Sequence, residues 1–326
     1  MKLIHVKSLC CQAKVKSLGA HRRQCAQCGK SWTIRPRKRG VKPRRINQQR
    51  IEKVFKRGQR IKDLVRGGKK YDSVQKLFSR QLTKAANRPA IYPIPGDKLV
   101  LIIDAQWHYF KKSLWTIYLV AIKPSHLNSA YFLDPVLRPG KEIAPHWAEV
   151  LEQIPINMKK RVFAVVSDGI RGIENAIINR GWLAQRCHFH LLSILQKQRG
   201  KRASTTGKKL RELIYQTVKA ALTETDSQKV RQMKQQLRQL AKYPVCPARM
   251  RTQVNGFIYS FKYYQTYIKN PELDIPNTTN VIESANSKIR RVVSKINNPY
   301  SWLKWTKMIL RKHPKFNCKG ANRYRN

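Results

Sequence analysis

The sequence predicts an α/β protein in which a mixed sheet carries a helical insertion and follows two small basic modules. Three observations lead to this fold class. Short apolar runs rich in β-branched residues occupy the middle of the chain, as expected for strands buried on both faces. Helical stretches alternate with the later runs, which indicates a sheet flanked by helices. The chain has 326 residues, enough for two or three domains.

The charge of the chain is strongly positive and unevenly distributed. Its 68 Lys and Arg residues outnumber 17 Asp and Glu residues, which gives a formal net charge of +51. Residues 1–96 hold 27 basic residues and three acids, and residues 284–326 hold 12 basic residues and no acid. Such a field favours a polyanionic partner over a small metabolite. We therefore expect nucleic acid to be contacted at both ends of the chain.

No contact with a membrane is expected. A spanning helix needs about 20 apolar residues, and runs such as 115–122 are far shorter. The first eleven residues lack the apolar core of a signal sequence. We expect a cytoplasmic protein.

The first module is a zinc-ribbon-like unit within residues 1–34. Cys25 and Cys28 belong to a CxxCGxxW knuckle, whose tight turn points two thiolates at one tetrahedral ion. Cys10 and Cys11 are the tentative second pair of zinc ligands, although adjacent cysteines cannot easily bind one ion together. The other candidate ligands are His5 and His21. The alternative is a small basic arm with ordinary reduced cysteines.

The second module covers residues 44–88 and has the pattern of a helix-turn-helix domain. Apolar residues recur at helical spacing in three short stretches, and Gly67-Gly68 separates the second from the third. In this charge context we expect the third helix to enter the major groove of DNA. The expected DNA contacts near its start are Arg66, Lys69 and Lys70. The alternative is a three-helix bundle with solvated charges.

A proline-rich linker at residues 89–95 precedes the α/β domain, which we place at residues 97–310. The strands expected in it are 98–104, 114–122, 130–136 and 161–168. Helices are expected at 144–153 and 170–179, and a helical insertion with basic outer faces at about 191–270. Residues 311–326 are expected to form a basic C-terminal tail.

Two carboxylates are predicted to close buried strands. Asp104 ends the LVLIID run, and Asp168 ends VFAVVSD directly before Gly169. An aspartate at a strand end is reachable from solvent yet held by the sheet, as an oxygen ligand of a hard divalent cation must be. The alternative for Asp168 is that it caps the helix that follows.

A third carboxylate, Glu283, lies far downstream in a predicted helix. Its spacing from Asn280 fits a capping box, which would make it a partner of its own helix start. Asn286, Arg290 and Arg291 follow one and two turns later, and this mixture suits a surface that binds metal and phosphate. Periodicity alone leaves both accounts open.

The motifs VSDGIRGIENAI, QRCHFHLLSIL and PNTTNVIESANSKIRR follow a LIID strand in this order. Together they resemble the mutator-type transposases of bacterial insertion sequences, over residues 98 to about 310. The N-terminal zinc ribbon with helix-turn-helix is also similar to members of that group. The resemblance implies an RNase H-like fold with an acidic DDE triad, and the helical insertion lies between the second and third acids.

By this resemblance the catalytic residues are Asp104, Asp168 and Glu283, which would hold two Mg²⁺ (or Mn²⁺) ions for in-line attack on a phosphodiester. Cys187 and His190 match the C-x-x-H signature of the family, for which we expect a structural or DNA-positioning role. The residues expected to neutralise DNA phosphates are Lys288, Arg290 and Arg291. His108 could assist near Asp104, although a lone histidine is more often structural.

The resemblance implies a DNA transposase that binds the terminal inverted repeats of its element. Water would cleave the donor strand, and the liberated 3′-hydroxyl would attack double-stranded target DNA. We expect a homo-oligomer on DNA, associated with a bacterial nucleoid. The alternatives are a non-catalytic DNA-binding protein derived from a transposase and a basic structural protein of nucleic acid or ribosomes. Three acids retained in so basic a chain favour the enzyme.

Overall fold

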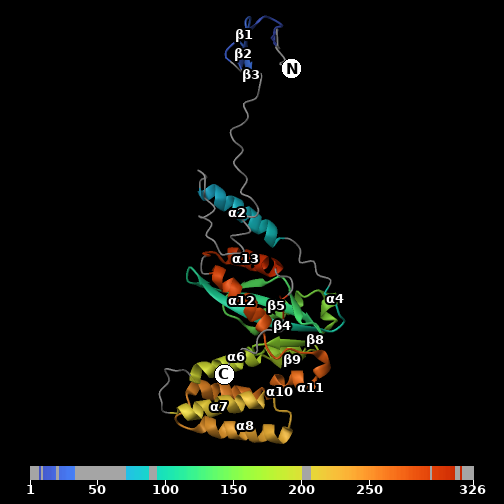
Figure 1. The fold of residues 1–326 in the computed structure, drawn as a ribbon, viewed down its shortest axis with the longest axis vertical. Helices are drawn as coiled ribbons and strands as arrows, with labels where there is room; N and C mark the ends of the chain where they lie inside the picture. Colours follow the sequence, from blue (N-terminus) through green and yellow to red (C-terminus); the bar gives the residue numbers. More distant parts are fainter. Residues whose placement is uncertain are drawn as a thin grey trace. The chain divides into compact units, whose positions relative to one another are not determined.

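The structure is a computed structural model that describes residues 7–8, 10–19, 22–33, 71–87, 94–199, 207–293, 296–312 and 316–317. The chain divides into two compact units, Met1–Arg66 and Gly67–Asn326 (Figure 1). The first two predicted helices of the helix-turn-helix domain lie outside the described residues, as do Arg66, Lys69 and Lys70.

The described part of the first unit is a small antiparallel sheet. Its strands are β1 (Val15–Ser17), β2 (Arg22–Cys25) and β3 (Ser31–Thr33), in the order β1-β2-β3. The CxxC turn connects β2 to β3, and the N–H of Gly29 donates to the carbonyl of Cys25 to close it. Gly29 has a φ of 70°, which glycine adopts at low cost.

The second unit is built around a mixed sheet with the order β10-β6-β5-β4-β8-β9, and β7 also pairs with β5. β5 is antiparallel to β4, β6 and β7, whereas β4, β8 and β9 are parallel neighbours. The strands are β4 (Leu99–Phe110), β5 (Ser113–Pro124), β6 (Ser129–Phe132), β7 (Val136–Pro139), β8 (Val162–Ser167), β9 (Leu183–Arg186) and β10 (Phe316–Asn317).

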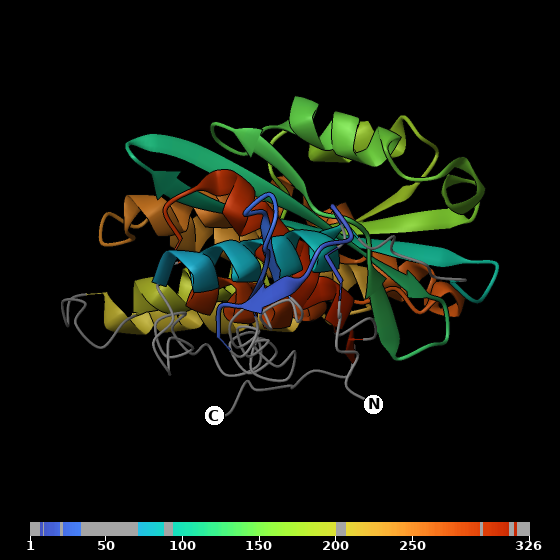
Figure 2. The same cartoon turned by 90° about the horizontal axis from the view of Figure 1, so that it is seen from above.

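Helices cover both faces of this sheet (Figure 2). The helices α3 (Ala144–Glu152) and α5 (Ile173–Ile178) bury an apolar core against one face, with the short helix α4 (Ile156–Lys159) between them in sequence. On the other face lie α12 (Asn280–Val293) and α13 (Pro299–Lys312).

The helix α2 (Tyr71–Ala86), expected as the third helix of the DNA-binding module, packs on α13. Val74, Phe78 and Leu82 are buried, and the Phe78 ring lies 5.5 Å from that of Trp305. The predicted helix is therefore present, and one of its faces is used for packing within the second unit. Its role in DNA recognition stays a prediction.

The helical insertion has a core of its own next to β9 (Figure 1). Two long amphipathic helices carry the stripes seen in the sequence, and their outer faces are basic. The elements are α6 (His188–Arg199), α7 (Lys208–Ala221), α8 (Ser227–Lys242), α9 (Ala248–Tyr259), α10 (Phe261–Tyr264), α11 (Thr266–Lys269) and the 3-10 helix η2 (Pro271–Leu273). The region predicted as an insertion consists of helices, the first of which begins at His188, and its status as an insertion in the domain stays a prediction.

One prediction about the sheet is wrong. Asp104 does not close its strand, because β4 continues for six more residues to Phe110 and pairs with β5 throughout. Aromatic residues in this extension favour a strand and keep it on the sheet. Rather than lying near a catalytic group, the His108 ring packs on Phe110 and Trp302, so its observed role is structural. The strand expected at 130–136 is divided into β6 and β7, and the strands β9 and β10 were not expected.

Candidate active site

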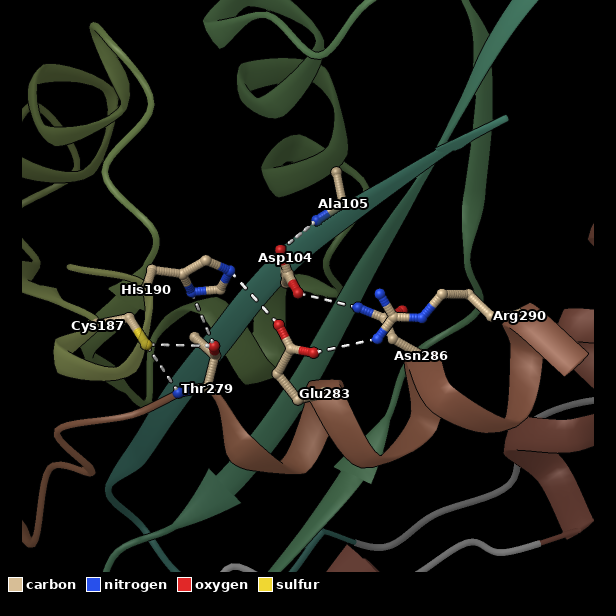
Figure 3. Close-up of polar contacts among 8 residues, drawn as sticks. All are labelled: Asp104, Ala105, Cys187, His190, Thr279, Glu283, Asn286 and Arg290. Carbon is tan, nitrogen blue, oxygen red and sulfur yellow. Dashed lines mark hydrogen bonds and ion pairs between the residues drawn. The ribbon is translucent and has the colours of Figure 1, made fainter. Parts of the chain in front are cut away.

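Asp104 is a buried carboxylate in the middle of β4, with a relative exposure of 5%. Its Oδ1 accepts a hydrogen bond from the N–H of Ala105 at 2.9 Å, and its Oδ2 accepts one from Nδ2 of Asn286 at 2.9 Å (Figure 3). Asn286 reaches it from α12, 182 residues later. The first predicted catalytic residue is thus fixed from two elements.

Asp168 lies beside Asp104 because β4 and β8 are parallel neighbours. Ile102 stands opposite Val166; Asp104 follows two residues later within β4, and Asp168 follows two residues later, directly after the end of β8. The next residue, Gly169, has a φ of 86°, and a Cβ there would meet Nε of Arg186 at 2.7 Å. Glycine after Asp168 therefore leaves room for a guanidinium that pairs with Glu174.

Glu283 enters the site from the first turn of α12. Its Oε1 lies 3.4 Å from Nε2 of His190, and its Oε2 lies 3.4 Å from Arg290 (Figure 3). The carboxylate is thus directed toward a histidine and an arginine, and its catalytic role stays a prediction. One ligand atom each from Asp104, Asp168 and His190 lie within 4.8 Å of one another, and Glu283 joins this group through His190.

The C-x-x-H signature and the start of α12 form one buried network. The Cys187 sulfur accepts a hydrogen bond from the N–H of Thr279 at 3.3 Å, and the Thr279 hydroxyl lies 3.3 Å from that sulfur. The same hydroxyl lies 3.5 Å from Nδ1 of His190, whose other nitrogen faces Glu283. His190, the second residue of the signature, also lies with two aspartates in a group whose ligand atoms could hold a metal ion.

The charges of these residues are strongly coupled. Burial raises the pKa of Asp104 well above its usual range, His190 opposes this shift, and Asp168 and Glu283 add to it. Burial alone would lower the pKa of His190, but the Cys187 sulfur and both aspartates outweigh it and raise that pKa to about 10. A cationic histidine among carboxylates is therefore the favoured state at neutral pH.

A fourth carboxylate, Glu142, was missed in the sequence. It precedes α3, and its Oε1 accepts a hydrogen bond from Nε1 of Trp147 at 2.7 Å. Burial and the charge of Asp168 raise its pKa to about 7, although the Trp147 bond opposes this. Glu142 follows no predicted strand and belongs to no motif. Its position near Asp168 is therefore evident only from the folded structure.

The donor atoms at this site fit a hard divalent cation. Carboxylate and amide oxygens are the ligands that Mg²⁺ prefers. Oδ1 of Asn286 is buried beside Asp104 and has no hydrogen-bond partner among the described residues. A cation there would favour the ionised form of Asp104, which burial otherwise disfavours.

Of the predicted phosphate contacts, Arg290 and Arg291 are exposed near the end of α12, and Lys288 is half-buried. The Arg290 side chain is 59% exposed to solvent and also contacts the Glu283 carboxylate. These three cations extend from the carboxylates along one helix.

The four N-terminal cysteines form a cluster in the first unit. Cys10, Cys11, Cys25 and Cys28 each place a sulfur within 4.8 Å of the others. Adjacent Cys10 and Cys11 therefore both place their sulfurs beside those of the CxxC pair, and their binding of one zinc ion stays a prediction. The Ser8 hydroxyl accepts hydrogen bonds from the N–H of Ala13 at 3.0 Å and from the Cys25 thiol at 3.3 Å.

The chemistry of this cluster suits a soft metal ion. When Cys25 is ionised, the Ser8 hydroxyl donates to the thiolate, and this bond, helped by backbone N–H groups of Cys28 and Gln27, lowers the pKa of Cys25 to about 6. Four thiolates at such spacing are a ligand set of structural zinc sites. The two other candidates, His5 and His21, lie outside the described residues.

Among the described residues, no helix is long and apolar enough to cross a membrane. No curated protein sequence matches the chain. Among solved structures, the chain is similar to the Drosophila P element transposase strand transfer complex, with 10% identity and a TM-score of 0.39, over 82% of this chain and 96% of that one.

A family model described as "Transposase, Mutator family" matches residues 138–316. This segment contains Asp168, both residues of the C-x-x-H signature, and Glu283. The match spans more than half of the 326 residues, and the chain therefore belongs to the Mutator family of transposases.

Proposed function

We propose that this transposase is a DDE enzyme with an RNase H-like sheet, in which Asp104, Asp168 and Glu283 carry out phosphodiester cleavage and strand transfer. One observation carries the proposal. Two aspartates on adjacent parallel strands share a cluster with His190, and Glu283 contacts that histidine from a helix far along the chain. The mixed order of the sheet supports the same fold.

In this proposal the carboxylates bind Mg²⁺ or Mn²⁺, which when bound would activate water or a 3′-hydroxyl and stabilise the leaving oxygen. Asn286 and the N–H of Ala105 hold the Asp104 carboxylate in one orientation. His190 keeps Glu283 in place through its Nε2 and offsets part of the negative charge. Lys288, Arg290 and Arg291 neutralise phosphates of the bound strand.

The basic N-terminal modules are proposed to recognise the terminal inverted repeats of the element, and the four cysteines to bind one Zn²⁺ per chain. Metal analysis of purified protein tests the second point. We expect about one zinc per chain, and none in the double variant Cys25→Ser, Cys28→Ser, on the ligand-count argument. Wild-type protein purified without chelator that holds no zinc would remove this proposal.

The enzymatic proposal is tested by cleavage and strand transfer on the DNA ends that flank the gene, with and without Mg²⁺. Asp168→Asn should abolish both reactions and leave DNA binding intact. The matched control is Asp97→Asn, because Asp97 is an exposed aspartate of the same unit. If wild type and Asp168→Asn are equally inert and bind equally well, the chain is a DNA-binding derivative of a transposase.

Two element ends have to be joined in one reaction, so we also propose a homo-oligomer on DNA. The mass of the complex with paired ends, measured by light scattering, checks this. A complex with a single chain per pair of ends would contradict it.

A further inference from the structure

The β4–β5 hairpin extends past the carboxylate cluster and exposes large aromatic side chains. Trp107 and Tyr109 are 62% and 58% exposed, and their rings meet edge to face at 6.1 Å. Exposed tryptophan on a soluble protein is uncommon enough to need an explanation. Neither the proposed chemistry nor the sheet core uses these two rings.

The opposite face of the same hairpin is anchored. His108 and Phe110 alternate with the exposed pair and pack on Trp302 of α13. The hairpin is therefore a rigid support, and the two exposed rings are held at fixed positions.

The hairpin also leaves one edge open next to the site. The pairing of β4 with β8 ends at Ile102 opposite Val166, whereas its pairing with β5 continues to Phe110. Beyond Asp104, the β8 side of β4 faces no other strand among the described residues. Trp107 lies three residues or about 10 Å along β4 from Asp104, roughly the length of three nucleotides, and its side chain is on the opposite face of the sheet, so a single strand would reach it by crossing this open edge.

The tip and flank of the hairpin are basic. Lys111 and Lys112 form the turn with φ values of 46° and 72°, a conformation that Asn and Gly adopt at lower cost. Arg138 stands in the same cross-strand row as Trp107, through Thr116. The two lysines therefore occupy a strained turn beside the exposed rings. Their positive charge makes this surface complementary to a phosphate backbone.

We propose that this surface, which we define as the hairpin strip (Trp107, Tyr109, Lys111 and Lys112), binds the single-stranded DNA next to the scissile phosphate. The two rings stack on unpaired bases and the two lysines contact phosphates. Aromatic rings with adjacent cations are the usual means of holding single strands without reading sequence. This inference rests on the proposed function, because that function places the scissile phosphate at Asp104.

The test is equilibrium binding of the full chain, in buffer without Mg²⁺ or Mn²⁺, to a fluorescent 20-nucleotide oligo-dT strand and to a 20-base-pair duplex. Loss of both stacking rings in Trp107→Ala, Tyr109→Ala should weaken binding of the single strand about 30-fold or more and leave the duplex nearly unchanged. The aromatic variant Trp107→Phe, Tyr109→Phe should recover most of the affinity. Tyr259→Ala is the matched control, because Tyr259 is 90% exposed on α9.

The lysines are tested through salt. In Lys111→Gln, Lys112→Gln, the slope of log affinity for the single strand against log salt concentration should fall by about 1.4, the value for two phosphate contacts. Unchanged single-strand affinity in the alanine variant, or an equal loss for both DNAs, would overturn stacking on unpaired bases. An unchanged salt slope would overturn the lysine contacts.

The two proposals fail separately, since binding without Mg²⁺ or Mn²⁺ needs no catalysis. If wild type cleaves DNA while the alanine variant binds like wild type, only the hairpin strip is refuted. If the strip binds single strands while wild type never cleaves, the proposed function fails and the binding surface stands.

Discussion

His188 gives a prediction about stability that follows directly from its burial. The residue lies between the two members of the C-x-x-H signature, and its Nε2–H donates to the carbonyl of Tyr264 at 2.8 Å. Burial lowers the pKa of His188 to about 4 from 6.5, although the Tyr264 bond opposes this. The folded protein therefore holds a neutral imidazole at a pH where the unfolded chain carries a charged one.

The sign and size of the effect follow from proton linkage. Between pH 6.5 and 4 the unfolded chain binds more protons at this position, so stability falls as the pH falls. The stabilisation is complete above pH 6.5 and is lost progressively toward pH 4. The two pKa values correspond to roughly 3 kcal/mol in total, of which about 2 kcal/mol is lost between pH 7 and pH 4.5.

The measurement is urea unfolding of wild type and His188→Gln, followed by the helical signal in circular dichroism. Glutamine can also donate to the Tyr264 carbonyl, but it does not titrate. Carboxylates elsewhere titrate equally in both proteins, so the difference between the two proteins isolates His188. That difference should fall by about 2 kcal/mol from pH 7 to pH 4.5. A difference that stays constant with pH would show that His188 is not buried as a neutral group.

Three further predictions concern the site itself. Thr279→Val removes the buried hydroxyl between the Cys187 sulfur and His190, and should lower cleavage activity about 10- to 100-fold, whereas Thr279→Ser should stay close to wild type; equal activities would show that the hydroxyl positions nothing. Gly169→Ala combines a positive φ with a clash against Arg186, so urea unfolding should show a large loss of stability. The control is Gly140→Ala, where φ is also positive but nothing lies within 4 Å of the added Cβ. The loss for Gly169→Ala should exceed the roughly 1 kcal/mol expected for this control. Glu142→Gln removes a negative charge that acts on Asp168, so the Mg²⁺ concentration for half-maximal cleavage should rise severalfold, and an unchanged Mg²⁺ titration would exclude a role for Glu142.

The sequence predicted the parts of the site that follow local patterns. Apolar runs before Asp104 and Asp168 gave two central strands, and the helical period around Glu283 placed it in the first turn of a helix. The family resemblance identified the pair Cys187 and His190. The family itself is confirmed.

The remaining features depend on contacts that no local pattern encodes. Glu142 comes within electrostatic reach of Asp168 only because the segment before α3 folds against the sheet. The strand β9 has four residues, too few for a clear pattern. The full length of β4 does not follow from an apolar run. Its extension beyond Asp104 mixes polar and aromatic residues, so the run that predicts the strand stops at Asp104.

The bond between Asn286 and Asp104 has a consequence for the order in which the protein matures. It joins residues 182 positions apart, so it belongs to the slowest class of contacts to form during folding. Synthesis begins at the N-terminus, and the cysteine cluster can form long before α12 leaves the ribosome. A nascent chain therefore completes the unit proposed to find DNA well before it completes the site proposed to cut it.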